Sequence, residues 1–321
     1  MGMYEDLAIF SGTANPKLAK EICDYLGTPL RGVDIYKFAN DNTFVRLHRS
    51  VRGQHVFVIQ PTCAPVNDNI MELLIMTDAL RRDSAGDITA VVTYYGYSRT
   101  DKKDQPRVPI TARLVADMIT AAGATRFMTM DLHADQIQGF FTIPVDDITA
   151  FHMLSDYFIQ KEIEDAVVVA PDVGATKLGR DFAEALDVPL TIIEKRRERS
   201  SGRRTEVLSL IGDVEGMNAI IFDDEIDTAG TVRDAALFLK GKGAQDVYAC
   251  VTHPILSHPG PERLNEAGLK ELVVTNTVPI SEEKMEKMED LEVTVLSVAP
   301  LLGEVIRRIY LGISVGEMFN E

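Results

Sequence analysis

One segment, residues 219–231, most narrowly limits the folds open to this chain. Residues 219–222 form a short apolar run, and two adjacent carboxylates, Asp223 and Asp224, end it abruptly. A small, hydroxyl-rich turn follows, and after Thr231 apolar residues recur at helical spacing. We therefore predict a buried strand, a loop and a helix N-terminus in succession, which is the unit of a parallel α/β sheet.

The two ends of this segment suit different chemical groups. Unpaired N–H groups and the helix dipole favour an anion at the helix N-terminus, and Gly230 lets the backbone approach it closely. Asp223 and Asp224 would repel an anion, so they must bind sugar hydroxyls or a metal. A sugar phosphate meets both requirements. The alternative is a solvated acidic strand end followed by a helix that Thr228 merely caps.

Strands and helices alternate along the rest of the chain. We predict strands at residues 55–60, 88–94, 127–130, 167–170, 190–193, 219–222, 247–251, 272–275 and 293–298. Helices are expected at residues 67–82, 111–122, 151–164, 175–186, 231–240 and 301–310. The alternation implies parallel sheets covered on both faces. Because 321 residues suggest two domains, we expect one domain at residues 1–149 and another at 150–321.

Composition excludes several classes of function. A net charge of −16 argues against nucleic-acid binding, and the apolar runs are too short to cross a bilayer. The N-terminus does not resemble a signal peptide. Three scattered cysteines lack metal-ligand spacing, so we expect reduced, buried thiols in a cytoplasmic protein.

Polar residues that follow predicted strands are the next candidates, because ligands of parallel sheets bind beyond the carboxyl ends of the strands. Arg99 suits a phosphate or a base, His133 a divalent metal or a phosphate, and Asp172 a Mg²⁺ ion. The respective alternatives are a charged surface loop, a histidine that forms an ordinary hydrogen bond, and a helix cap.

Residues 195–204 carry six basic side chains and one acidic one in an otherwise acidic protein. The segment is polar, contains a glycine and shows no periodicity, so we predict a mobile loop. A cationic lid of this kind would neutralise charge on transferring phosphates. A solvated basic loop or a nucleic-acid patch is the alternative, and the acidic background disfavours the patch.

Together these segments resemble the ribose-phosphate pyrophosphokinase (phosphoribosyl pyrophosphate synthetase) family nearly from end to end. Residues 223–231 resemble the family's ribose-5-phosphate loop, which phosphoribosyltransferases share. Segments more particular to the synthetases are residues 50–53, 62–69, 71–74, 95–99, 130–134, 136–141 and 252–254. The resemblance implies two Rossmann-like phosphoribosyltransferase-type domains, each a mainly parallel sheet flanked by helices, with the last helices packing across both.

The resemblance also implies a reaction. The diphosphoryl group of ATP moves to O1 of ribose 5-phosphate with Mg²⁺, which gives 5-phosphoribosyl 1-pyrophosphate and AMP. Lys195 and Arg197 become the catalytic cations, and His133 and Asp172 the metal ligands. The expected ATP-binding residues are Phe38, Asn40, Asn42, Arg99, Thr100 and His133. The expected ribose-5-phosphate-binding residues are Asp223, Asp224, Asp227, Thr228, Ala229, Gly230 and Thr231.

Assembly and control follow from the same resemblance. Family members form homo-oligomers, commonly hexamers built from dimers, in which Phe38 and Asn40 would reach the adenine of a neighbouring subunit. Inorganic phosphate activates family enzymes and ADP inhibits them. Ser50, Arg52 and Ser314 are the corresponding effector candidates in this chain.

Departures from the family pattern gather at the nucleotide end. Thr100 stands where the family has Gln, Asp41 and Asn42 replace Gly-Glu, and Glu194 replaces Asp. They motivate an alternative, a non-catalytic regulatory homologue that assembles with an active synthetase. A phosphoribosyltransferase is a further alternative, which the synthetase-like motifs of the N-terminal half disfavour.

Overall fold

The computed structural model describes the chain except residues 1–3, 5, 201–202 and 320–321, and except the side chains of residues 195–207. The described chain divides into two compact units. The first consists of Met1–Thr149, Thr277–Pro279 and Ser297–Glu321, and the second of Ala150–Asn276 and Ile280–Leu296. The segment that begins at Ser297 thus returns to the first unit. Among the described residues, no helix has both the length and the apolar character needed to cross a membrane.

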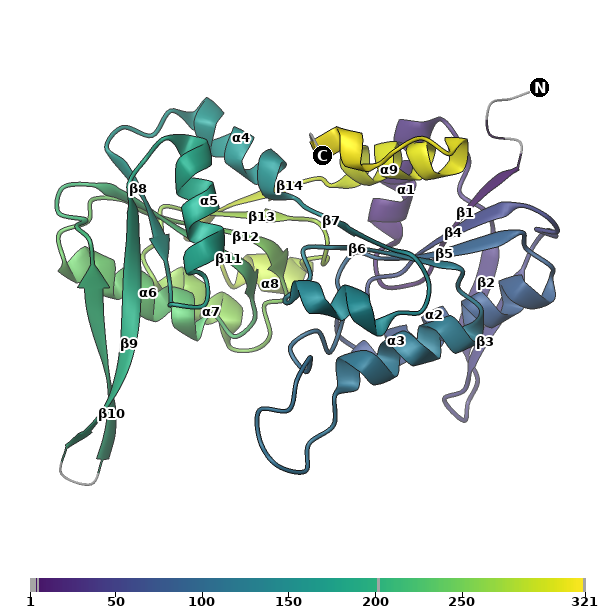
Figure 1. Cartoon of the computed structure of the whole chain (residues 1–321), viewed down its shortest axis with the longest axis horizontal. Coiled ribbons are helices and arrows are strands. Elements are labelled where there is room, and N and C mark those ends of the chain that lie inside the picture. The colour runs from purple at the N-terminus through teal and green to yellow at the C-terminus, as the bar shows by residue number, and fades with distance from the viewer. Residues whose placement is uncertain (1–3, 5, 201–202, 320–321) are drawn as a thin grey trace. The chain divides into compact units, whose positions relative to one another are not determined.

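The first unit is built on a five-stranded parallel sheet in the order β1-β4-β5-β6-β7 (Figure 1). Its strands are β1 (Leu7–Ser11), β4 (His55–Ile59), β5 (Asp87–Val92), β6 (Arg126–Met130) and β7 (Val145–Ile148). Helices α1 (Pro16–Leu26) and α9 (Ala299–Leu311) pack together on one face, with α2 (Val66–Arg82) and α3 (Thr111–Ala122) on the other. A short helical turn, η1 (Asp135–Phe140), follows β6, and η2 (Gly316–Phe319) follows α9. An antiparallel hairpin of β2 (Val33–Lys37) and β3 (Thr43–Leu47) completes the unit.

The second unit is built on a seven-stranded sheet in the order β10-β9-β8-β11-β12-β13-β14. Its strands are β8 (Ala166–Ala170), β9 (Leu190–Ser200), β10 (Arg203–Ile211), β11 (Asn218–Ile226), β12 (Val247–Pro254), β13 (Glu271–Thr275) and β14 (Glu292–Leu296). Only β10 is antiparallel to its neighbour. Figure 1 shows α4 (Phe151–Lys161) and α5 (Thr176–Leu186) on one face, and α6 (Gly230–Gly241) and α7 (Gly260–Glu266) on the other. Helix α8 (Glu282–Glu286) precedes β14.

The predicted fold class is confirmed, because both sheets are mainly parallel and flanked by helices. Every strand and helix expected from the alternation is present, with ends shifted by a few residues except in β9, which extends seven residues beyond the predicted strand. Fully buried apolar runs such as β8 cannot be placed elsewhere, since both faces of a parallel strand are covered. Elements that the alternation missed are β1, α1, β2, β3, β7, β10, α7 and α8.

The prediction of a loop at residues 195–204 is wrong for the described backbone, which forms two paired strands, whereas its mobility stays a prediction. Residues 195–200 continue β9, and β10 pairs with them in antiparallel register, so that Lys195 lies opposite Leu208. Hydropathy identifies a charged run as a loop, whereas a partner strand supplies ladder hydrogen bonds whatever the side chains are. We call β9 and β10 the basic hairpin.

A buried polar network shapes the first turn of the N-terminal unit. Gln60 is fully buried and Glu72 is 7% exposed. Glu72 accepts hydrogen bonds from the backbone N–H of Thr13 at 2.6 Å and from Gln60 at 2.9 Å, and Gln60 accepts one from Ala14 at 3.1 Å. A methyl group on Gly12 would overlap the carboxamide of Gln60 and lie 2.6 Å from Glu72 Oε1. Glycine is therefore required where the chain leaves β1.

We expect Gly12→Ala to destabilise the protein by about 1–3 kcal/mol, because Gln60 and Glu72 cannot move without breaking these hydrogen bonds. The midpoint of urea unfolding measures the effect. Gly241→Ala is the matched control, since its methyl group would meet open space at the end of α6. Equal midpoints for the two variants would contradict the steric argument.

Candidate functional site

The acidic pair, Asp223 and Asp224, lies inside β11 rather than after it, because that strand continues to Ile226. A tight turn follows and α6 begins at Gly230. Ala229 is the N-cap residue and adopts a left-handed conformation with φ 57°. Since the N-cap residue is Ala229, which has no capping side chain, the alternative that Thr228 merely caps the helix is wrong. The first N–H groups of an α-helix have no acceptor within the helix, and an N-terminus of this kind suits an anion.

The charge at the acidic pair favours binding of a cation or of hydrogen-bond donors. Burial, then the charges of Asp224 and Asp172, raise the pKa of Asp223 to about 8. Its carboxylate accepts a hydrogen bond from the backbone N–H of Asp224 at 3.0 Å, which offsets only part of the penalty. In the absence of a ligand, Asp223 therefore holds its proton at neutral pH. Ionisation needs a positive partner.

Asp172 follows β8, the neighbour of β11 in the sheet, and its charge acts on Asp223. One carboxylate oxygen accepts a hydrogen bond from the N–H of Ala175 at 3.1 Å, but Ala175 is itself the N-cap residue of α5 and forms no side-chain cap, so the helix-cap alternative for Asp172 is wrong. Within the described part of the chain, no group of three or more Asp, Glu, His or Cys residues could hold a metal by itself. Mg²⁺ commonly takes one or two carboxylates and completes its octahedron with water and phosphate oxygens, so these residues fit it.

We expect folding stability of the ligand-free protein to fall as pH rises from about 4 to 8, through the titration of Asp223. Its pKa is about 8 when folded and 3.8 as an ordinary carboxyl group, so within that window only the folded state keeps the proton. Asp223→Asn should flatten this slope and raise stability near pH 8 by about 1 kcal/mol. Thermal unfolding across that range measures both effects. An unchanged slope in the variant would contradict the assignment.

The nucleotide candidates of the first unit begin with the loop after β5. Arg99 is exposed, and the loop around it is held by two hydrogen bonds of 2.7 Å, from the N–H of Gly96 to Thr62 and from the hydroxyl of Tyr97 to Asn67. Thr100 donates its hydroxyl hydrogen to the carbonyl of Tyr97, also at 2.7 Å. Thr100 therefore stabilises the turn, and its short side chain cannot reach as far as the Gln of the family pattern.

His133 lies in an exposed position just beyond β6, at the same sheet edge. The backbone N–H of the preceding residue, Leu132, donates a hydrogen bond to Asp147 at 3.3 Å. Burial, then the charges of Asp131 and Asp135, raise the pKa of Asp147 to about 7. The acidic surroundings suit a divalent cation near His133.

Phe38, Asn40 and Asn42 occupy the tip of the β2–β3 hairpin. Phe38 is 48% exposed and packs edge-on against Tyr36 and Phe44, with ring centroids 5.3 and 5.5 Å apart. The carboxamide oxygen of Asn40 accepts a hydrogen bond from the N–H of Asn42 at 3.3 Å. The hairpin thus presents an aromatic surface to solvent in the isolated chain.

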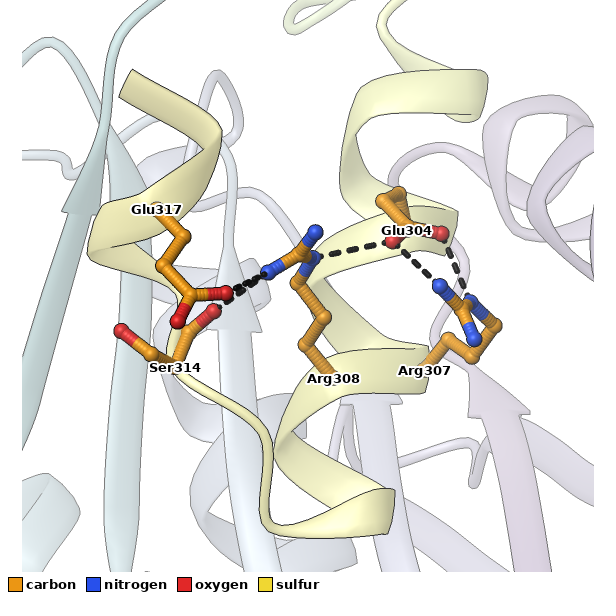
Figure 2. Close-up of polar contacts among 5 residues, drawn as sticks. All are labelled: Glu304, Arg307, Arg308, Ser314 and Glu317. Atoms are coloured by element: carbon orange, nitrogen blue, oxygen red, sulfur yellow. Dashed lines mark hydrogen bonds and ion pairs between the residues drawn. The ribbon is translucent and has the colours of Figure 1, made fainter. Parts of the chain in front are cut away.

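The effector candidates, Ser50, Arg52 and Ser314, all belong to the first unit. Ser50 lines a cavity of about 340 Å³ together with Arg31 and Arg49, which the sequence did not single out, whereas Arg52 does not line it. The carbonyl of Ser314 accepts a hydrogen bond from Arg308 at 2.6 Å, and Arg308 also pairs with Glu304 and Glu317 (Figure 2). In the described part of the chain, no hydrogen bond joins Ser314 to Ser50 or Arg52.

The catalytic candidates Lys195 and Arg197 have their backbone in β9, and their side chains lie outside the described part of the structure. Since β9 is parallel to β8, the basic hairpin extends from the sheet edge at which Asp172 lies. Sequence reasoning missed Arg263, which donates to the carbonyl of Thr228 at 3.0 Å. No sequence pattern connects these two residues, because they lie 35 positions apart.

Two family models match the chain. The N-terminal domain of ribose phosphate pyrophosphokinase matches residues 7–123, and the phosphoribosyl synthetase-associated domain matches residues 200–320. The ribose-phosphate pyrophosphokinases of Caldanaerobacter subterraneus subsp. tengcongensis and Wolinella succinogenes are 53% and 49% identical, over 98% and 97% of this chain and 98% of each relative. A crystal structure of phosphoribosylpyrophosphate synthetase from Mycobacterium smegmatis is similar with a TM-score of 0.89 at 44% identity, covering 96% of this chain and 100% of that one.

Proposed function

The chain belongs to the ribose-phosphate pyrophosphokinase family, and from that premise we propose that it makes 5-phosphoribosyl 1-pyrophosphate and AMP from ATP and ribose 5-phosphate. The observation that carries the proposal is the acidic pair followed by an uncapped helix N-terminus in the second unit. That arrangement provides partners for ribose hydroxyls at one end and for a phosphate at the other. Close similarity to synthetases over almost the whole chain supports making phosphoribosyl pyrophosphate over consuming it.

In the proposed reaction, O1 of ribose 5-phosphate bonds to the β-phosphorus of ATP. The bond from that phosphorus to the oxygen bridging the α- and β-phosphates breaks, AMP leaves with that oxygen, and the proton of the O1 hydroxyl is released to solvent. Phosphoryl-type transfer depends on positioning and charge neutralisation more than on covalent chemistry with the protein. Lys195 and Arg197 of the basic hairpin would neutralise charge on the transferring group.

The binding roles follow the two units. Arg99, Thr100 and His133 would bind ATP, and residues 227–231 would surround the 5-phosphate, while Asp223 and Asp224 accept from ribose hydroxyls. Bound Mg²⁺ would neutralise the polyphosphate, with His133 and Asp172 as its protein ligands. A cytoplasmic location agrees with these substrates and with three buried cysteines that form no disulfide.

The proposal is tested by measuring AMP released from ATP, Mg²⁺ and ribose 5-phosphate. We expect AMP in amounts equal to the phosphoribosyl pyrophosphate formed, over a range of inorganic phosphate concentrations. No AMP above background at any phosphate concentration would favour the regulatory homologue. Consumption of phosphoribosyl pyrophosphate that depends on an added base would favour a phosphoribosyltransferase.

Lys195→Ala should lower kcat about 100- to 1,000-fold, because one donor to the charge of the transition state is lost. The KM for ribose 5-phosphate should change little, since the proposed contact strengthens only during transfer. Lys242→Ala, at the far end of α6, is the control with the same change in charge. If both variants turn over like the wild type, Lys195 has no role in the transition state.

We further propose a homo-oligomer, a hexamer built from dimers, in which Phe38 and Asn40 complete the adenine site of a neighbouring subunit. The exposed aromatic cluster on the hairpin supports this, because such a surface is suited to stacking against a base or a partner. Inorganic phosphate would activate the assembly through Ser50, Arg52 and Ser314.

Subunit mixing tests the neighbouring contact. Phe38→Ala and Lys195→Ala subunits should each be weakly active alone, yet their co-expressed mixture should regain activity, since some sites then combine an intact Phe38 with an intact Lys195 from different subunits. Co-expression of wild type with each variant gives the reference values. Activity of the mixture no higher than the average of the separate variants would place Phe38 in its own subunit's site.

A further inference from the structure

The turn that leads from the acidic pair into α6 is supported along its carbonyl side by the segment between β12 and α7. The carbonyl of Ile226 accepts hydrogen bonds from the N–H groups of Ile255 and Leu256, both at 3.0 Å. The carbonyl of Asp227 approaches Gly260 so closely that a methyl group there would lie 2.7 Å from it. Three successive carbonyls, of residues 226, 227 and 228, therefore face this segment, the third through Arg263.

These contacts fix the direction in which the N–H groups of the turn point. A peptide bond is planar and trans, so its N–H points opposite to its C=O. Because the carbonyl of Thr228 faces Arg263, the N–H of Ala229 in the same peptide faces away from α7. The carbonyl of Asp227 faces Gly260, so the N–H of Thr228 also faces away from α7. The turn thus directs successive amides to the side on which the uncapped N-terminus of α6 is open.

This arrangement needs support, because Ala229 adopts φ 57°, a conformation that non-glycine residues avoid. Arg263 supplies it as a fixed donor 3.0 Å from the carbonyl that precedes Ala229. A guanidinium stays protonated at any working pH and holds its donors in a rigid plane, so it restrains the peptide better than a flexible ammonium.

Arg263 also places charge beside the proposed phosphate. A methyl group on Gly230, the first residue of α6, would lie 3.5 Å from Arg263 Nη1. In the described part of the chain, no carboxylate forms an ion pair with Arg263, in contrast to Arg233, whose guanidinium bonds Asp234 at 2.7 Å. The positive charge of Arg263 therefore adds to the helix dipole at the same point.

We propose that Arg263 of α7 is a positioning residue for the 5-phosphate of ribose 5-phosphate. It holds the Thr228 carbonyl so that the turn presents its amides to the phosphate, and its charge adds to that of the helix N-terminus, without a role in the transfer step. The inference rests on the proposed function and adds a residue to its ribose-phosphate site.

The test compares Arg263→Met and Arg263→Lys with Arg233→Met, which removes an equal charge from α6 without touching the turn. Initial rates of AMP release give kcat and the KM values for ribose 5-phosphate and ATP. We expect Arg263→Met to raise the KM for ribose 5-phosphate about tenfold or more, the loss typical of one charged hydrogen bond, with kcat and the KM for ATP nearly unchanged. Arg263→Lys should recover part of the loss, and Arg233→Met should resemble the wild type.

A second variant covers the case in which Arg263→Met does not fold. Gly260→Ala presses on the carbonyl of Asp227 from the same side without changing charge, so it should also raise the KM for ribose 5-phosphate selectively. Equal KM values for Arg263→Met and Arg233→Met, or equal losses toward both substrates, would overturn the proposal. So would a fall in kcat alone.

Calorimetric titration with ribose 5-phosphate and Mg²⁺, without ATP, separates this inference from the proposed function. If the wild type releases no AMP, the proposed function fails, and weaker binding to Arg263→Met than to Arg233→Met still supports the positioning role. If the wild type is active and both variants bind equally, the positioning role alone fails.

Discussion

The site depends on one constraint, the unfavourable free energy of holding three carboxyl groups together at the edge of one sheet. These groups belong to Asp223, Asp224 and Asp172. Burial and mutual repulsion keep Asp223 protonated when no ligand is present. A substrate that carries hydroxyls and arrives with a divalent cation relieves that cost, whereas a bare anion would increase it. The protein thus keeps a destabilising feature in the free state because the bound state uses it.

The uncapped N-terminus of α6 complements this acidic edge. A carboxylate-rich strand end and an anion-binding helix end would oppose each other if they shared one ligand group, but the turn at residues 227–229 separates them. The turn keeps its shape because the segment that follows β12 and Arg263 of α7 support its carbonyls. Selectivity for a sugar phosphate therefore depends on backbone direction as much as on side-chain chemistry.

Sequence patterns predicted the helices and the parallel strands because a short apolar run that is buried on both faces, such as β8, fits few positions other than the interior of a parallel sheet. They missed α1, although Asn15, Pro16 and Gly27 are a helix cap, a first-turn proline and a left-handed C-cap in sequence. They also missed the extension of β9 into charged residues, because strand pairing uses the backbone, which hydropathy does not report. Local signals were present in the first case and absent in the second.

By itself, the sequence determined the family and the α/β fold class, because these depend on local patterns and on motifs in a fixed order. Only the tertiary structure decided that Thr228 is not a helix cap, that Thr100 turns back to Tyr97, and that Arg263 holds the turn. The first two depend on the local backbone conformation, and the third on a hydrogen bond between residues 35 positions apart, which leaves no periodicity in the chain.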